Sequence, residues 1–189
     1  MRIRSARQED AACVAELARD TFVATFGHIY SSDDLATFLA ASYSPEIQRA
    51  EICASDRLTL VAEDRSRLVA FAQAGPLGLP IDPGARRAAE LKRLCLQSAF
   101  FGTGIADGLM AGVEAWARAR AVEDLYLGVW ALNGRAQRFY RRHGFEIVGR
   151  YIFRVGAHED DERIMRRALA DADSRSGSDA GDGGARGLA

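Results

Sequence analysis

The chain has 189 residues, 48% of them hydrophobic and 27% charged, and a formal net charge of −1 at pH 7. This length suits one domain with one core, and the apolar fraction excludes an intrinsically disordered chain. The near-neutral charge excludes the excess of basic residues that nucleic-acid-binding proteins concentrate on one face, so we expect no nucleic-acid partner.

The cysteines and the N-terminus exclude further classes. Cys13, Cys53 and Cys95 are odd in number and far apart, and they form no Cys/His cluster, so we expect reduced thiols and no metal site. The first residues carry charge but no apolar signal-peptide core, and no stretch approaches the length of a membrane span. We therefore expect a cytoplasmic protein without a membrane partner.

The first half of the chain alternates between helical and strand-like patterns. Apolar spacing and capping residues predict a short strand, one helix and two further short helices, followed by a β-hairpin with a polar turn. These elements span Arg2 to Ala6, Gln8 to Phe22, Ser31 to Ala54 for the two short helices, and Arg57 to Glu63 with Leu68 to Gly75 for the hairpin.

The second half continues the mixture of strands and helices. We predict a strand at Glu90 to Gln97 and, after a glycine turn, a helix at Gly102 to Arg120. A strand at Asp124 to Trp130 and a helix at Gly134 to His143 follow, and a closing pair of strands spans Phe145 to Val155 and Arg163 to Leu169. This order predicts an α+β fold, an α/β sandwich in which helices flank a mixed, largely antiparallel sheet. Residues 1–170 form the expected domain. Residues 171–189, almost without apolar side chains, form the expected disordered tail.

A glycine turn joins a strand to a helix at Phe101-Gly102-Thr103-Gly104-Ile105-Ala106. Glycines let a ligand approach the backbone closely, and the free N–H groups and dipole of a helix start attract phosphate. The sequence around this turn matches neither a Walker A loop nor a dinucleotide fingerprint. Two interpretations stay open, a pyrophosphate site and a turn that only shapes the start of the helix.

A second motif is a short helix with clear ends. Asn133 suits its N-cap and Gly144 its C′ position, while Asn133, Ala136 and Tyr140 share one face. The Tyr140 phenol is protonated at neutral pH and can donate to a leaving thiolate, which makes it a candidate general acid. The alternative is a half-buried tyrosine with a structural role.

The two motifs in this order resemble those of the GNAT superfamily of acyl-CoA N-acyltransferases. The family's phosphate turn is similar to residues 101–106, and its motif Asn-x-x-Ala-x-x-Phe-Tyr-x-x-x-Gly-Phe matches residues 133–145 completely. Leu127-Gly-Val-Trp130 and Thr21-Phe22 further resemble the bacterial branch with spermidine/spermine N-acetyltransferases. Two positions depart from these patterns, because Phe101 replaces a family Gln or Arg and Cys95 replaces an aromatic residue.

The resemblance implies an acetyl-CoA-dependent N-acetyltransferase that acts on a primary amine of a small molecule, a polyamine being one possibility. It implies that the main chain of Leu94 and Leu96 pairs with pantetheine and that Asn133 contacts the same arm. The amides from Phe101 through Ala106 (Phe101, Gly102, Thr103, Gly104, Ile105 and Ala106) would hold the pyrophosphate.

An ammonium substrate must lose a proton before attack, so the resemblance also implies a basic carboxylate near the central strand. Glu90 is the candidate base; the alternative is a solvated charge at a strand end. Two other functions stay open, a non-catalytic acyl-CoA-binding module and an acetyltransferase of protein N-termini or lysines. The sequence leaves the oligomeric state open, including a homodimer.

Overall fold

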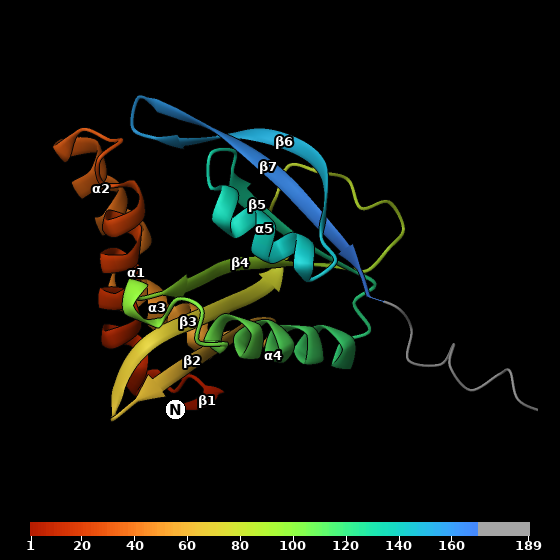
Figure 1. Ribbon diagram of the computed structural model, residues 1–189, viewed down its shortest axis with the longest axis horizontal. Helices are drawn as coiled ribbons and strands as arrows, with labels where there is room; N and C mark the ends of the chain where they lie inside the picture. The colour runs from red at the N-terminus through yellow and green to blue at the C-terminus, as the bar shows by residue number, and fades with distance from the viewer. Residues whose placement is uncertain (170–189) are drawn as a thin grey trace, which may run out of the picture.

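Seven strands form one sheet in the order β1-β2-β3-β4-β5-β7-β6, as the computed structural model shows (Figure 1). Residues 1–169 are described, and the expected tail, 171–189, lies outside them. The strands are β1 (Arg2–Ser5), β2 (Leu58–Asp64), β3 (Arg67–Pro76), β4 (Ala88–Leu96), β5 (Asp124–Trp130), β6 (Glu146–Val155) and β7 (His158–Ala168). Only β4 and β5 pair in parallel among these strands, so the expected largely antiparallel sheet is confirmed.

Helices cover both faces of this sheet. They are α1 (Ala11–Phe26), α2 (Ser32–Ser42), α3 (Pro45–Cys53), α4 (Ile105–Ala119) and α5 (Gly134–Arg142), with 3-10 turns at Gln8–Asp10 and Ser98–Phe100. Figure 1 shows α1, α2 and α3 together at one end, while α4 and α5 lie beneath the long β6–β7 hairpin.

The alternation of side chains along β3 explains this layering, because successive residues of a strand point to opposite faces. Phe71 packs with Val14 and Leu17 of α1 in one apolar cluster. The neighbouring Ala70 and Ala72 belong to a second cluster, which contains α4, α5 and the inner side of β5. The sheet therefore separates two cores, and a site between them can be reached from both sides.

The expected helix at 102–120 begins later than the sequence indicated. It starts at Ile105, because Gly102 and Gly104 adopt φ values of +76° and +83°, which a right-handed helix does not allow. The three residues before Ile105 therefore form a turn at the N-terminus of α4. The helix expected at 134–143 agrees within one residue, with the side chain of Asn133 accepting a hydrogen bond from the Ala136 N–H at 3.0 Å.

The parallel pair β4–β5 is paired only at its beginning. Ala88 to Glu90 align with Asp124 to Tyr126, and no further partners join the two strands within residues 1–169. Beyond this point β4 continues to pair with β3, and β5 with β7. The sheet thus opens between its two halves, and the opening faces the glycine turn and α5.

Candidate active site

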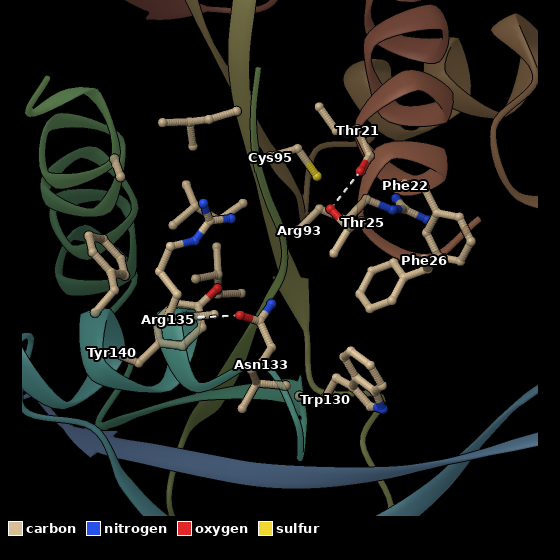
Figure 2. Close-up of a pocket in the computed structure, with 18 of the residues that line it drawn as sticks. Thr21, Phe22, Thr25, Phe26, Arg93, Cys95, Trp130, Asn133, Arg135 and Tyr140 are labelled. Atoms are coloured by element: carbon tan, nitrogen blue, oxygen red, sulfur yellow. Dashed lines mark hydrogen bonds between the residues drawn. The ribbon is translucent and has the colours of Figure 1, made fainter. Parts of the chain in front are cut away.

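A cavity of about 580 Å³ lies where β4 and β5 diverge. Its size falls within the range typical of small-molecule sites. Figure 2 shows two facing walls: Asn133, Arg135 and Tyr140 come from α5 and the residues before it, and Phe22 and Phe26 come from α1. We call these the α5 wall and the α1 wall; β4 runs between them.

The glycine turn forms one end of the α5 wall. Gly102 and Gly104 line the cavity, and a Cβ atom at either position would meet nothing within 4 Å. Their surroundings are therefore open, and the positive φ values are the reason that glycine fits there. Thr103 turns away and donates a hydrogen bond to the Phe100 carbonyl at 2.7 Å.

The side chains that flank the turn divide between core and cavity. The side chain of Ile105, the first residue of α4, is buried in the core, so only its backbone is available to a ligand at this turn. Ala106 and Phe101 line the cavity. Phe101 is 43% exposed, and the Arg135 guanidinium lies 3.7 Å from the centre of its ring. This cation–π contact places a positive charge beside the glycine turn.

Arginines of α5 extend this positive charge. Arg135, Arg138 and Arg142 all line the cavity at spacings of three and four, which places them on one side of the helix. Asp107, at the start of α4, also lines the cavity near these arginines, and its Oδ1 atom lies 2.9 Å from His143 Nε2. The α5 wall is therefore electropositive around an open helix start, as an anion site requires.

Tyr140 lies deeper along the same wall. Its ring is buried, 9% exposed, and it lines the cavity beside Ala136 and Phe139. Burial raises the pKa of the Tyr140 phenol above its ordinary value, and the Cys95 thiol and Glu162 carboxylate raise it further. The phenol is consequently protonated across the neutral range and can donate a proton.

Strand β4 forms the floor of the cavity. Leu94 and Leu96 line it, and Cys95, between them, also reaches the lining. Burial raises the pKa of the Cys95 thiol, so this thiol stays protonated. Arg93 also lines the cavity, but its guanidinium is bound by Glu51 Oε2 and Gln73 Oε1, each at 2.7 Å.

Glu90 does not line this cavity. Its Oε2 atom lies 3.0 Å from Lys92 Nζ and 2.8 Å from the Gly78 N–H, which donates to it. Its side chain is 12% exposed. The structure therefore places Glu90 in a bonded cluster beside the cavity, with little of its side chain exposed to solvent.

Three of the cavity residues that the sequence did not indicate as site residues lie next to one another. Trp130 of β5, Glu162 of β7 and Tyr151 of β6 are direct neighbours across the sheet and line the cavity together. Residues 159–162 read Glu-Asp-Asp-Glu, an acidic run that looks like a solvated charge cluster. The alternation of side chains along a strand predicts that these four residues divide between the two faces of the sheet, but it does not predict which face lines the cavity.

The structure describes no helix capable of crossing a membrane within residues 1–169. In the same part of the chain, no group of three or more His, Cys, Asp or Glu side chains is arranged to hold a metal ion.

Comparisons with known proteins agree with this geometry. A profile of the acetyltransferase (GNAT) family matches residues 16–145. The chain is 33% identical over 160 residues to an uncharacterized N-acetyltransferase of Mycobacterium tuberculosis, covering 85% of this chain and 98% of the relative. An uncharacterized N-acetyltransferase of Lactobacillus delbrueckii is 25% identical over 158 residues, covering 81% and 88%.

Solved structures have the same fold. The PaiA N-acetyltransferase of Thermoplasma acidophilum, solved in complex with coenzyme A, superposes with a TM-score of 0.73 at 25% identity, covering 89% of this chain and 98% of that protein. The ribosomal-protein-alanine N-acetyltransferase of Brucella melitensis gives 0.65 at 24% identity, covering 89% and 100%. These findings do not single out the spermidine/spermine branch, which stays a prediction.

Proposed function

The chain belongs to the GNAT family of N-acetyltransferases, and from that premise we propose that it transfers the acetyl group of acetyl-CoA to a primary amine of a small molecule. The observation that carries this proposal is the opening between β4 and β5, which runs into an electropositive glycine turn at the start of α4. The CoA complex of the PaiA protein, which shares the fold, supports acetyl-CoA as the cosubstrate.

The glycine turn is suited to the pyrophosphate of the coenzyme. Backbone N–H groups at the start of α4 are free of helical partners, and the helix dipole favours negative charge there. We assign the amides from Gly102 through Ala106 to this role, including those of Thr103 and Ile105, whose side chains point elsewhere. The Phe101 N–H already donates to the Ser98 carbonyl at 3.1 Å and would have to exchange this partner for a phosphate oxygen. The backbone would thus supply most of the phosphate contacts.

Arg135 offers the side-chain charge that Phe101 lacks. The family commonly has Gln or Arg at position 101, whereas here the Phe101 ring lies against the Arg135 guanidinium. Arginine donates to phosphate oxygens in a forked geometry and keeps its charge at every accessible pH. We propose that α5 delivers this guanidinium to the phosphates, so that the departure at Phe101 does not abolish coenzyme binding.

The thioester would lie in the opening of the sheet. The main chain of Leu94 and Leu96 borders the opening and would pair with the pantetheine amides, and Asn133 would contact the same arm. An N–H of this strand, at Leu96, would polarise the thioester carbonyl and stabilise the oxyanion that forms on attack. The sulfur would then face α5, where Tyr140 supplies the proton of the leaving thiol.

The acceptor amine would approach from the α1 wall. A polyamine is one acceptor that the sequence suggests. Glu90 as the base stays a prediction, although its carboxylate is bound by Lys92 and by the Gly78 N–H.

Calorimetry with acetyl-CoA, followed by a thiol-release screen over polyamines, amino acids, aminoglycosides and peptides, tests this function. Binding in the micromolar to millimolar range and turnover of at least one small amine are expected. Folded protein that gives no heat with millimolar coenzyme would overturn the proposal, and turnover of peptides alone would favour a protein acceptor. Activity is also expected to survive chelation with EDTA, since the mechanism assigns no step to a metal.

A further inference from the structure

The acceptor side of the cavity is mainly aromatic. Phe22 and Phe26 of α1 face it, and the Phe26 ring packs edge-on against Trp130 with centroids 5.7 Å apart. Phe153, Tyr30, Tyr43 and Tyr151 also line the cavity, together with Thr21 and Thr25 of α1. Rings arranged in this way bind apolar or aromatic groups and are attracted to a nearby cation through their faces.

Charged groups on this side are mostly bonded already. Arg93 is bound by Glu51 and Lys92 by Glu90. Asp160 does not line the cavity, and its carboxylate accepts the Tyr30 hydroxyl and lies 3.3 Å from His158 Nε2. The carboxylates of Glu51, Glu90 and Asp160 are therefore already engaged by protein groups and are not available to recognise an ammonium group.

Glu162 differs from all of them. Among residues 1–169 it has neither a side-chain hydrogen bond nor an ion pair, yet it lines the cavity. Its register neighbours are Trp130 on β5 and Tyr151 on β6, and directly opposed residues of antiparallel strands project from the same face of the sheet. A partly buried carboxylate without a protein partner is costly unless a ligand of opposite charge completes it.

Glu162 and Tyr140 act on the cavity from opposite faces of the sheet. Tyr140 belongs to the core cluster on the α4 and α5 side, with Leu127 and Met165. Glu162 lies in the other alternation set of β7, opposite Trp130, whose ring contacts α1. A nucleophile held at Glu162 would thus meet the thioester from one side, while the sulfur leaves toward the phenol on the other.

We propose that Glu162 binds the ammonium group of the acceptor and accepts its proton, and that the acceptor is a primary amine carrying one positive charge on an apolar or aromatic body. This inference rests on the proposed acetyltransferase function and names the substrate class of the same site. A polyamine fits less well, because its additional ammonium groups would find no second unpaired carboxylate among the described residues of the acceptor side.

The proton and electron balance is complete with these two groups. The ammonium gives one proton to Glu162, and the free amine attacks the carbonyl carbon to form the N–C bond. Collapse of the tetrahedral intermediate breaks the C–S bond, whose electron pair stays on sulfur and takes the Tyr140 proton. The amide nitrogen then loses its extra proton to the Tyr140 phenolate through water, and Glu162 releases its proton to solvent. Each turnover releases one proton.

The surroundings of Glu162 favour proton exchange near neutral pH. Burial raises its pKa to about 7, and the carboxylates of Asp160 and Asp161 on the same strand add to this effect. Three ionisable groups of other elements lie close enough to interact electrostatically with Glu162: Tyr151 of β6, Tyr30, and Tyr140 of α5 on the other side of the cavity. Burial raises the pKa of each of these phenols. A base with a pKa near the working pH is efficient in proton transfer.

The substrate class is tested with the full chain, acetyl-CoA and two probes, 2-phenylethylamine and spermidine. We expect kcat/KM for 2-phenylethylamine to exceed kcat/KM for spermidine by roughly tenfold or more, because the ratio of these two constants measures how much better the enzyme binds one transition state than the other. If the coenzyme binds and spermidine or an amino acid is the better substrate, the inference fails while the acetyltransferase function stands. Absence of coenzyme binding would overturn the function itself.

The role of Glu162 is tested with Glu162→Gln, with Glu159→Gln as the matched control. Glu159 lies on the same strand, is exposed, pairs with Arg154 and does not line the cavity. We expect kcat/KM to fall by roughly a hundredfold or more in Glu162→Gln and to stay within about twofold in Glu159→Gln. An equal or larger loss in Glu90→Gln, with Glu162→Gln near wild type, would assign the base to Glu90 and overturn the inference.

The pH profile distinguishes proton transfer from positioning. In the wild type, kcat/KM should fall below a pKa near 7 as Glu162 gains a proton, and Glu162→Gln should lose this limb. A limb that persists near pH 7 in the variant contradicts the assignment.

Thermal unfolding gives a readout that does not depend on activity. Because the folded pKa lies above the ordinary value of 4.5, ionising Glu162 costs stability as pH rises from about 4.5 to about 7. Glu162→Gln should therefore raise Tm relative to wild type more at pH 8 than at pH 5. A difference that is independent of pH would show that the carboxylate is not desolvated as described.

Discussion

The two walls of the cavity are built in different ways. The α5 wall is made of two short, continuous segments, the glycine turn and the α5 helix, and the contacts that we propose for the coenzyme there are largely with backbone groups. The acceptor side combines the α1 wall with single side chains from β5, β6 and β7, which are far apart in the chain. The first arrangement can be recognised in a sequence as a motif, whereas the second depends on register and packing. Coenzyme binding and acceptor choice should accordingly respond to different substitutions.

Tyr140→Phe should give the largest effect on the α5 wall. The substitution keeps the ring but removes the proton donor, so kcat should fall by roughly ten- to a thousandfold, with the smallest loss at low pH, where solvent can supply the proton. The phenol forms no hydrogen bond with residues 1–169, so the free energy of unfolding should change little. Stopped assays of thiol release check this prediction, with coenzyme Kd measured in parallel.

Tyr126→Phe is the matched control for that experiment. Tyr126 is 3% exposed on β5 and does not line the cavity. It should retain wild-type kcat. If Tyr140→Phe also does so across pH with an active amine, Tyr140 is a structural residue.

Gly104→Val should weaken coenzyme binding without touching the chemistry. A β-branched residue at φ +83° costs about 1–2 kcal/mol, so the turn would leave its conformation and Kd for acetyl-CoA should rise roughly 5- to 30-fold. Gly84→Val imposes similar strain at φ +63° in a loop outside the cavity, with equally open surroundings. Calorimetry should find Kd for acetyl-CoA unchanged in this control. An equal increase of Kd in both variants would show that the glycine turn does not bind the phosphates of the coenzyme.

Arg135→Gln should have an intermediate effect. Loss of one phosphate contact by a guanidinium should raise Kd for acetyl-CoA by roughly 3- to 10-fold, and added salt should narrow the difference from wild type. Phe101→Leu, which removes only the ring beneath the guanidinium, should change Kd less. A larger loss in Phe101→Leu than in Arg135→Gln would show that the ring itself contacts the coenzyme.

Phe26→Leu should have the smallest effect and only on the acceptor. The substitution keeps an apolar side chain but removes the edge-on contact with Trp130, so KM for 2-phenylethylamine should rise by a few-fold. Coenzyme Kd should stay constant, because α1 lies on the opposite wall from the glycine turn. A parallel change in both constants would mean that the two walls are not independent.

The sequence predicted the elements that have local signals. Asn133 caps α5, Gly144 follows that helix with φ +78°, and Ser44 and Pro45 begin α3, as their types indicate. The start of α4 was misplaced because helical periodicity continues through Gly102, although both glycines are left-handed. Periodicity reports which side chains face the core, but not where the backbone enters the helix.

The candidate site was predictable on one wall only. The residues of the glycine turn and Tyr140 follow from contiguous motifs, and most of them line the cavity. Glu162 required the register of β7 against β5 and β6, which depends on pairing across the sheet rather than on neighbouring residues. The partners of Glu90, Lys92 and the Gly78 N–H, likewise follow from a loop whose path the sequence does not specify.

The opening between β4 and β5 also bears on the stability of the protein. Beyond Glu90 and Tyr126 each strand has an edge without a ladder partner across the opening in the described chain. A coenzyme lying there would act as a folding ligand, because binding only the native state stabilises it by about 2.7 kcal/mol at a concentration a hundred times Kd. Resistance to heat and proteolysis would then increase with the ratio of coenzyme concentration to Kd. Protein that loses its coenzyme during purification would be the less stable form.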